Sequence, residues 1–277
     1  MRGFLSFFAV LFWFVSAFGC RSAPTVGGSG GSSPAVPASP SGQAIPSAPP
    51  STSGTGVDLA GGGRGYLVLP EGAGKHPAII VIQEWWGLND WIRENTARFA
   101  KQGYVALAVD LYRGRTATDA GEAHELMRGL PEDRAIADLQ AGVTFLTART
   151  DVDADRIGSV GWCMGGGYSL ALATAEPRLR AAVINYGRLV TAPEKIEAVR
   201  PALLGNFGGA DRGIPADDVR AFEQKLKAAH KEADIKVFDG KGHGFMNPNN
   251  KDGYDAAAAS EAWSRIDVFF ARTLKGK

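Results

Sequence analysis

Three side chains that could act as nucleophile, acid and base occur in that order along the chain, at Cys163, Asp211 and His243. Cys163 lies in Gly161-Trp162-Cys163-Met164-Gly165, where flanking glycines allow a tight turn from a strand into a helix. Such a turn raises the thiol above a sheet edge, at the positive end of a helix dipole. An imidazole oriented by a carboxylate can take the proton of a thiol, so the set predicts nucleophilic catalysis. Taken singly, each residue is equally typical of a packing turn or a surface loop.

A fourth segment, "VIQEWWGLND", places Glu84 directly after an expected strand. The backbone N–H groups of Trp85 and of Met164, the residue after the nucleophile, would face a developing oxyanion. Trp86 is expected to line the pocket. A carboxylate opposes formation of a nearby thiolate, so Glu84 by itself reads as a solvated loop residue.

Alternating strands and helices must position these segments. Apolar runs predict strands at 66–70, 77–82, 104–112, 156–162, 181–186, 201–207 and 234–240. Helical patterns fall at about 90–101, from 131 onward, at 165–175, around 219–226 and at 254–274. The order predicts an α/β fold of three layers, with a mainly parallel central sheet and helices on both faces. The candidate residues follow strands, so they can meet at the carboxyl edge of the sheet.

Five short motifs together resemble the dienelactone hydrolase (carboxymethylenebutenolidase) family of α/β-hydrolases. They are "QEWWG", "VDLYRG", "GWCMGG", "GGADRGIP" and "GHGF", within about residues 61–277. The resemblance implies a Cys163–His243–Asp211 triad that cleaves a carboxylic ester or lactone through a thioester intermediate, without a cofactor. It also implies that Glu84 interacts with the resting thiol and takes part in its activation when substrate binds.

The chain departs from the family pattern where a substrate carboxylate is bound. The family uses two arginines, and Arg113 or Arg115, just after "DLY", could serve as the first. Asn247 stands at the position of the second and cannot supply a charge. We therefore expect a different lactone or ester substrate, unless Arg188 or Arg212 fills the role.

Two other functions use the same residues. An acyltransferase would pass the acyl group to an acceptor other than water, and the sequence does not separate this from hydrolysis. A non-catalytic ligand-binding domain is the other alternative, but binding alone does not require a nucleophile, acid, base and glutamate together.

The first 60 residues differ in composition from the rest. Residues 1–19 combine Arg2 with an apolar run at 4–18, which is short for a membrane span. The following "SAFGC" resembles the lipobox of bacterial lipoproteins, with Cys20 as the lipidated residue. Residues 20–60 are rich in Ser, Gly, Pro and Ala and predict a disordered tether before a catalytic domain at 61–277.

These features predict an exported bacterial lipoprotein, held by Cys20 at the periplasmic or outer-membrane face. The alternatives are an uncleaved anchor or an ordinary secretory signal that leaves a soluble periplasmic or secreted protein. If Cys20 carries lipid, Cys163 has no disulfide partner, since the chain has only two cysteines.

The composition narrows the range of partners. A formal net charge of +1 gives no electrostatic reason to expect nucleic acid. The four histidines form no pair at metal-ligand spacing, so no metal is expected. We expect a monomer that acts on a small molecule.

Overall fold

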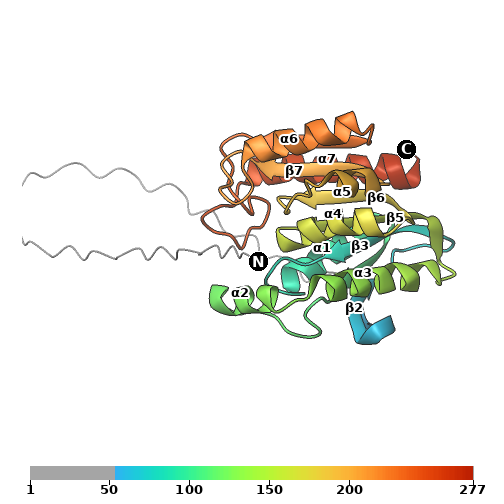
Figure 1. Cartoon of the computed structure of the whole chain (residues 1–277). Coiled ribbons are helices and arrows are strands. Elements are labelled where there is room, and N and C mark those ends of the chain that lie inside the picture. Colours follow the sequence, from blue (N-terminus) through green and yellow to red (C-terminus); the bar gives the residue numbers. More distant parts are fainter. Residues whose placement is uncertain (1–53, 277) are drawn as a thin grey trace, which may run out of the picture. The chain divides into compact units, whose positions relative to one another are not determined.

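An eight-stranded sheet runs through the residues that the structure, a computed structural model, describes, 54–276 (Figure 1). Its strands are β1 Thr55–Leu59, β2 Gly63–Val68, β3 His76–Ile82, β4 Val105–Val109, β5 Val152–Trp162, β6 Leu179–Asn185, β7 Ala202–Gly208 and β8 Ala233–Phe238. Their order across the sheet is β1-β2-β4-β3-β5-β6-β7-β8. The pairings of β1 with β2 and of β2 with β4 are antiparallel, and all the others are parallel.

Helices cover both faces of this sheet. They are α1 Asp90–Lys101, α2 Ala120–Arg128, α3 Glu132–Thr147, α4 Met164–Ala175, α5 Pro193–Ala198, α6 Ala216–Ala228 and α7 Ala256–Phe270, with the short η1 Ala60–Gly62 and η2 Ala271–Lys275. The buried side chains of α1 and α7 share one core cluster, and those of α3, α4 and α6 belong to clusters on the opposite face. The expected three-layer α/β arrangement is therefore confirmed.

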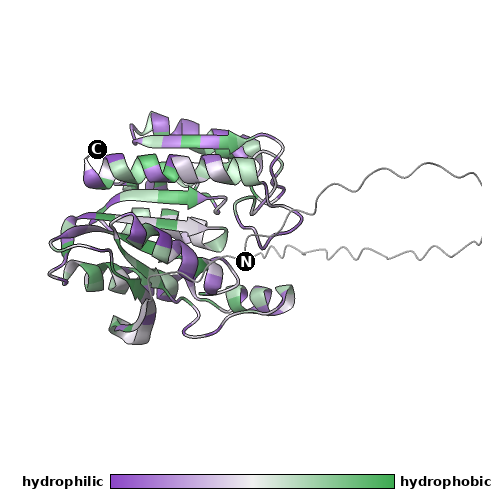
Figure 2. Cartoon of the chain, turned by 180° about the vertical axis from the view of Figure 1, so that it is seen from behind, coloured by the Kyte–Doolittle hydropathy of each residue, from purple (hydrophilic) through white to green (hydrophobic). Residues whose placement is uncertain are grey.

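The central strands are apolar because both of their faces are covered. The run Ala78–Ile82 of β3 is fully buried, as is all of β4. In Figure 2 the strands inside the molecule are mostly green, whereas the helices carry both green and purple. Helices such as α1 and α6 thus turn an apolar stripe to the sheet and a polar stripe to water, whereas α4 consists mostly of small and apolar residues. This packing fixes the sheet edge that carries the site.

The expected start of the folded domain at residue 61 lies too late. Residues Thr55–Leu59, assigned from composition to the disordered tether, form β1 and pair with β2. The pairing buries Leu59, while the rest of the strand is partly or fully exposed. A short edge strand with few apolar residues is hard to distinguish from a tether, because backbone pairing holds it more than side-chain burial does.

The helices α2 and α5 were not expected from the sequence. The start of α2 carries a recognisable signal, since the N–H of Glu122 donates to the Asp119 carboxylate at 2.9 Å. Gly129 ends this helix. Residues 1–53, which include the expected signal peptide and Cys20, lie outside the described residues. Within the described part, no helix is long and apolar enough to cross a membrane.

Candidate active site

Cys163 lies on a sharp turn between β5 and α4. Its backbone has φ 54° and ψ −120°, a conformation rare for a residue with a side chain and typical of strained functional turns. A Cβ on Gly161 would come within 2.0 Å of the Gly165 carbonyl oxygen, and one on Gly165 within 2.4 Å of the Gln83 carbonyl oxygen. Glycine is therefore required on both sides of the cysteine, as the sequence pattern predicted.

Asp211 and His243 meet at the same edge of the sheet. Asp211 follows β7 and His243 follows β8, and their side chains lie 2.7 Å apart between the Asp211 Oδ2 and the His243 Nδ1. The other carboxylate oxygen, Oδ1, accepts hydrogen bonds from the N–H groups of Gly213 at 2.8 Å and Ile214 at 3.2 Å. The carboxylate is thus fixed by its own turn and in turn fixes one nitrogen of the imidazole.

The charges of this pair support each other. Burial raises the pKa of Asp211, but the hydrogen bonds from His243 and from the turn hold it below its usual range. Burial alone lowers the pKa of His243, but hydrogen bonds with Asp211 and with Cys163 raise it to about 10. The negative charges of the Asp211 carboxylate and of a Cys163 thiolate both contribute to this rise, so the imidazolium is stable once the thiol has lost its proton to the imidazole.

Glu84 is buried beside this pair, with a single hydrogen bond to its carboxylate. The Nδ2 of Asn247 donates to its Oε2 at 2.6 Å, and both side chains are almost fully buried. Burial raises the pKa of Glu84 to about 7, against smaller opposing effects of Asn247 and His243. Near neutral pH, Glu84 can therefore both hold and release a proton.

A cavity of about 840 Å³ opens in front of the thiol. Its lining includes Cys163, His243, Glu84 and Asn247, together with Trp85 and Trp86. The two indole rings lie edge to face, 5.1 Å apart. Met164 is the first residue of α4, where a helix leaves the N–H group without an internal partner. This one cavity is therefore lined by predicted site residues that follow three different strands, namely Glu84, Trp85 and Trp86 after β3, Cys163 after β5, and His243 and Asn247 after β8.

The two arginines expected to bind a substrate carboxylate do not line this cavity. The Nη2 of Arg113 donates to the buried carboxylate of Asp138 at 3.0 Å and to the Gly61 carbonyl at 3.2 Å. Arg115 pairs with Glu122 at 3.8 Å on the surface.

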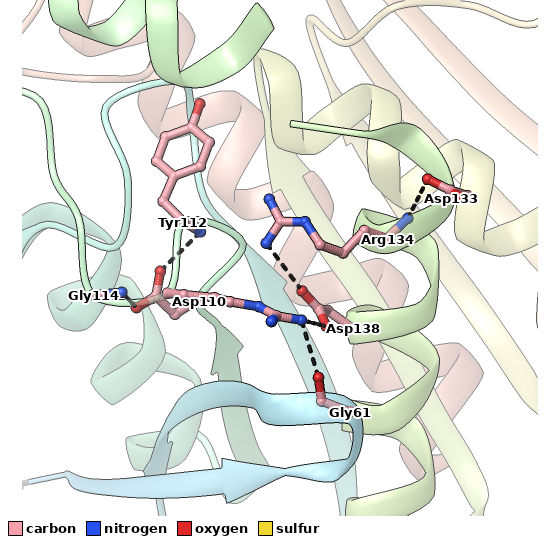
Figure 3. A network of polar contacts seen from close by, with 8 residues as sticks. Gly61, Asp110, Tyr112, Gly114, Asp133, Arg134 and Asp138 are labelled. Atoms are coloured by element: carbon pink, nitrogen blue, oxygen red, sulfur yellow. Dashed lines mark hydrogen bonds and ion pairs between the residues drawn. The ribbon is translucent and has the colours of Figure 1, made fainter. Parts of the chain in front are cut away.

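Arg113 is held away from the cavity by the carboxylate of Asp138, which is buried and needs cationic partners. Figure 3 shows this carboxylate beside Arg134, with which it also pairs at 3.9 Å. Asp110 shapes the turn around this residue by accepting from the N–H groups of Tyr112 and Gly114 (Figure 3). In this turn Arg113 adopts a φ of 54°. Of the other candidates, Arg188 lines a separate cavity and Arg212 is exposed.

The cavity also contains residues that the sequence analysis missed. The loop after His243 contributes Asn249, Asn250, Lys251 and Asp252, and the unexpected helix α2 contributes Met127. Among the lining residues, Lys251 is the only lysine or arginine. The signal for the loop was its composition, "NPNNKDG", since a polar loop that directly follows a catalytic histidine must border the same edge.

Among residues 54–276, no group of His, Cys, Asp and Glu side chains could hold a metal ion. The side chains that line the cavity are of the types that take part in acid–base and nucleophilic chemistry.

Comparisons with known proteins agree with the fold and the motifs. The model of the dienelactone hydrolase family matches residues 64–274. A protein of Salmonella typhimurium, assigned as a carboxymethylenebutenolidase, is 34% identical over 222 residues, which are 75% of this chain and 82% of that protein. A protein of Methylorubrum extorquens with the same assignment is 32% identical over 219 residues, 74% of this chain and 75% of that one.

A solved structure gives the same result. The crystal structure of a protein from Klebsiella pneumoniae, assigned as a dienelactone hydrolase, superposes with a TM-score of 0.72 at 30% identity. The match covers 80% of this chain and 98% of that one. The fold is therefore shared along nearly the whole of that protein.

Proposed function

Because this chain belongs to the dienelactone hydrolase family, we propose that it cleaves a lactone or carboxylic ester through a thioester on Cys163. Hydrolase activity on this bond class follows from the family. The observation that carries the cysteine mechanism is the geometry of three residues. Cys163, on its strained turn, shares a cavity with His243, and Asp211 lies 2.7 Å from the imidazole.

The proposed reaction has two halves. His243 takes the proton of Cys163, the sulfur attacks the carbonyl carbon, and the N–H groups of Met164 and Trp85 stabilise the oxyanion. The C–O bond breaks, and the imidazolium gives its proton to the leaving oxygen. Water, deprotonated by His243, then attacks the thioester, which releases the acid and restores the thiol. Asp211 orients the imidazole throughout.

Glu84 is proposed to control the proton of the resting thiol. In its protonated form it places no negative charge beside the sulfur, and in its ionised form it can accept the proton of the thiol and pass it on to His243. Its pKa of about 7 makes both forms available near neutral pH. A thiol kept protonated until substrate binds is also protected from oxidation, because the thiolate is the reactive form.

The proposed substrate is a neutral lactone or ester. The lining of the cavity includes the indoles of Trp85 and Trp86 and one lysine, Lys251, whose neighbour Asp252 also lines it. A substrate carboxylate bound there would lack the pair of arginines that the family uses. Loss of one charged hydrogen-bond partner costs about 2–5 kcal/mol, so carboxylated lactones should be poor substrates.

Replacement of the nucleophile tests this mechanism. Cys163→Ala should lower kcat by at least about a thousandfold on every lactone and aryl ester that the wild type hydrolyses. Cys163→Ser should also be poor, since Glu84 and His243 are arranged for a thiol. An unchanged melting temperature would show that the fold is intact. Wild-type hydrolysis by Cys163→Ala would disprove the mechanism.

The same assay separates hydrolysis from acyl transfer. With wild-type enzyme and no added acceptor, mass spectrometry should detect the acyl group on Cys163 and then the free acid. Turnover that requires an added alcohol or amine would identify a transferase instead.

We also propose that the protein is exported and anchored through lipid on Cys20, as a monomer. The support is the "SAFGC" stretch and the tether-like composition after it. Intact-mass measurement of the membrane fraction should give a diacylated chain that begins at Cys20. A mature chain that begins elsewhere, or that lacks lipid, would refute this proposal.

A further inference from the structure

A second cavity, of about 460 Å³, opens at the same edge of the sheet, beside the one that contains the thiol. Its walls are formed by the end of α2 with the residues that lead into the start of α3, by α4 from Met164 to Ala171, and by the segment after β6. Most of its lining is apolar, namely Met127, Leu130, Met164, Gly167, Tyr168, Ala171, Leu189 and Val190. Nothing in the triad chemistry requires this cavity.

Two residues connect the second cavity with the reaction site. Met127 lines both cavities. Met164 follows the nucleophile directly, so its N–H faces the proposed oxyanion while its side chain forms part of the second cavity. A substrate whose carbonyl group lies at Cys163 is therefore next to Met164, whose side chain belongs to the apolar lining of the second cavity.

The shape of the cavity follows from small residues on one face of α4. The small residues are Gly167 and Ala171, and Met164 precedes them on the same side of the helix, since the three are three and four positions apart. A Cβ on Gly167 would lie 3.2 Å from the backbone nitrogen of Arg188, so the helix and the segment after β6 are in close contact there. At Ala171 the methyl group leaves space that a larger side chain would fill.

The apolar walls belong to two different parts of the core. Met164 and Tyr168 pack against the cluster under α3, and Leu189 and Val190 pack against the cluster under α6. All four side chains are only half-buried, because the cavity separates them from further partners. The charged residues of the lining, Arg128, Glu132 and Arg188, are exposed and form a polar rim toward water.

We propose that this second cavity binds an apolar acyl or alkyl chain of the substrate while the carbonyl group lies at Cys163. The inference rests on the proposed function and specifies its substrate class: neutral esters or lactones with a medium-length hydrocarbon chain. The half-buried apolar walls gain contacts when such a chain enters, and water leaves them. A short acyl group reaches none of these contacts.

A chain-length series measures the effect. For aryl esters from acetate to octanoate, kcat/KM should rise by at least about tenfold over the whole series. Full burial would give an upper limit of about fourfold for each added methylene, so the expected rise lies well below that limit. Ala171→Phe places a ring in the cavity from α4, two helical turns away from the nucleophile. The ratio of kcat/KM for octanoate to that for acetate should then fall by about tenfold, to near unity.

A second variant and a matched control make the result independent of one helix position. Val190→Phe fills the same cavity from the opposite wall, in a segment outside any helix, and should lower the ratio in the same way. Ser260→Phe adds a ring of the same size at an exposed position of α7, in a remote cavity, and should leave the ratio at its wild-type value. Circular dichroism and melting temperature verify that each variant is folded.

The possible outcomes separate the two proposals. A wild type that does not favour octanoate over acetate overturns the inference, and so does an unchanged ratio in both cavity variants. Hydrolysis of acetate that survives Cys163→Ala overturns the proposed function instead. A ratio lowered by both cavity variants and preserved in Ser260→Phe supports the chain-binding role.

Discussion

Two buried carboxylates lie at the same edge of the sheet, Asp211 after β7 and Glu84 after β3, and their partners differ in number and charge. Asp211 accepts from an imidazole and from two backbone N–H groups. Glu84 accepts from one neutral amide, that of Asn247. The pKa of Asp211 is held below its usual range, whereas that of Glu84 is raised to about 7.

The difference shows that the surroundings of a carboxylate assign its role. Burial opposes the charged form in both places, but only Asp211 receives enough donors and an adjacent cation to offset this cost. Asp211 can therefore remain a fixed negative charge that orients His243. Glu84 can exchange a proton near neutral pH, which suits control of a thiol.

The largest expected effect comes from removing the charge of Asp211. In Asp211→Asn, the amide N–H₂ group would face His243 Nδ1 and force the proton onto the other ring nitrogen, so the imidazole could no longer accept the thiol proton. We expect kcat to fall by roughly a thousand- to ten-thousandfold. The exposed Asp218→Asn on α6 is the control and should remain active. A loss of less than tenfold in Asp211→Asn would argue against the triad.

Removing the charge of Glu84 should stabilise the protein at high pH. Its folded pKa lies above the value of 4.5 for an unperturbed glutamate, so the unfolded chain ionises first and stability is lost as pH rises from about 4.5 to about 7. At each pH, the unfolding free energy of Glu84→Gln is compared with that of the wild type. The variant's advantage should be about 3 kcal/mol larger at pH 8 than at pH 4. Urea unfolding at both pH values measures this, with the exposed Glu94→Gln as control. An equal difference at the two pH values would contradict the raised pKa.

The same variant should lose activity. If the ionised Glu84 accepts the thiol proton, Glu84→Gln should lower kcat/KM by about a hundredfold, the scale of general-base catalysis. The wild-type pH profile should rise through an inflection near pH 7, and the variant should lack it. A variant that keeps the inflection would assign it to another group.

The smallest expected effect comes from a substitution that makes the surroundings of Glu84 more like those of Asp211. Asn247→Arg would place a cation beside the carboxylate, lower its pKa and supply a partner for an anionic substrate. The preference for a free-acid substrate over its methyl ester should rise by about thirtyfold. Asn247→Gln, which stays neutral, should not change it. A wild type that already prefers the free acid would show that another cation, such as Lys251, binds the carboxylate.

The sequence alone was sufficient for much of the fold and for the parts of the site built within one turn. The strands β3 and β4 contain continuous apolar runs, which are typical of strands covered on both faces. Gly161 and Gly165 identify the turn around Cys163, because backbone atoms exclude any side chain at either position. The order of Cys163, Asp211 and His243 predicts their meeting, since each follows a parallel strand of one sheet.

Contacts between distant segments required the tertiary structure. From the sequence, Arg113 was a candidate to bind a substrate carboxylate. In the structure it forms a salt bridge with the buried carboxylate of Asp138 in α3. The strand β1 is recognised by its pairing with β2, because its own side chains are mostly polar or exposed. Long-range partners of this kind leave no periodic pattern in the chain.

The cysteine turn and the order of the three catalytic candidates were thus determined by the sequence, through local backbone sterics and the direction of parallel strands. The protonation of Glu84 was decided by the tertiary structure. Its pKa depends on its burial and on Asn247, a partner 163 positions away along the chain. Desolvation and a single distant hydrogen bond are properties of the packed molecule, and no local stretch of residues contains them.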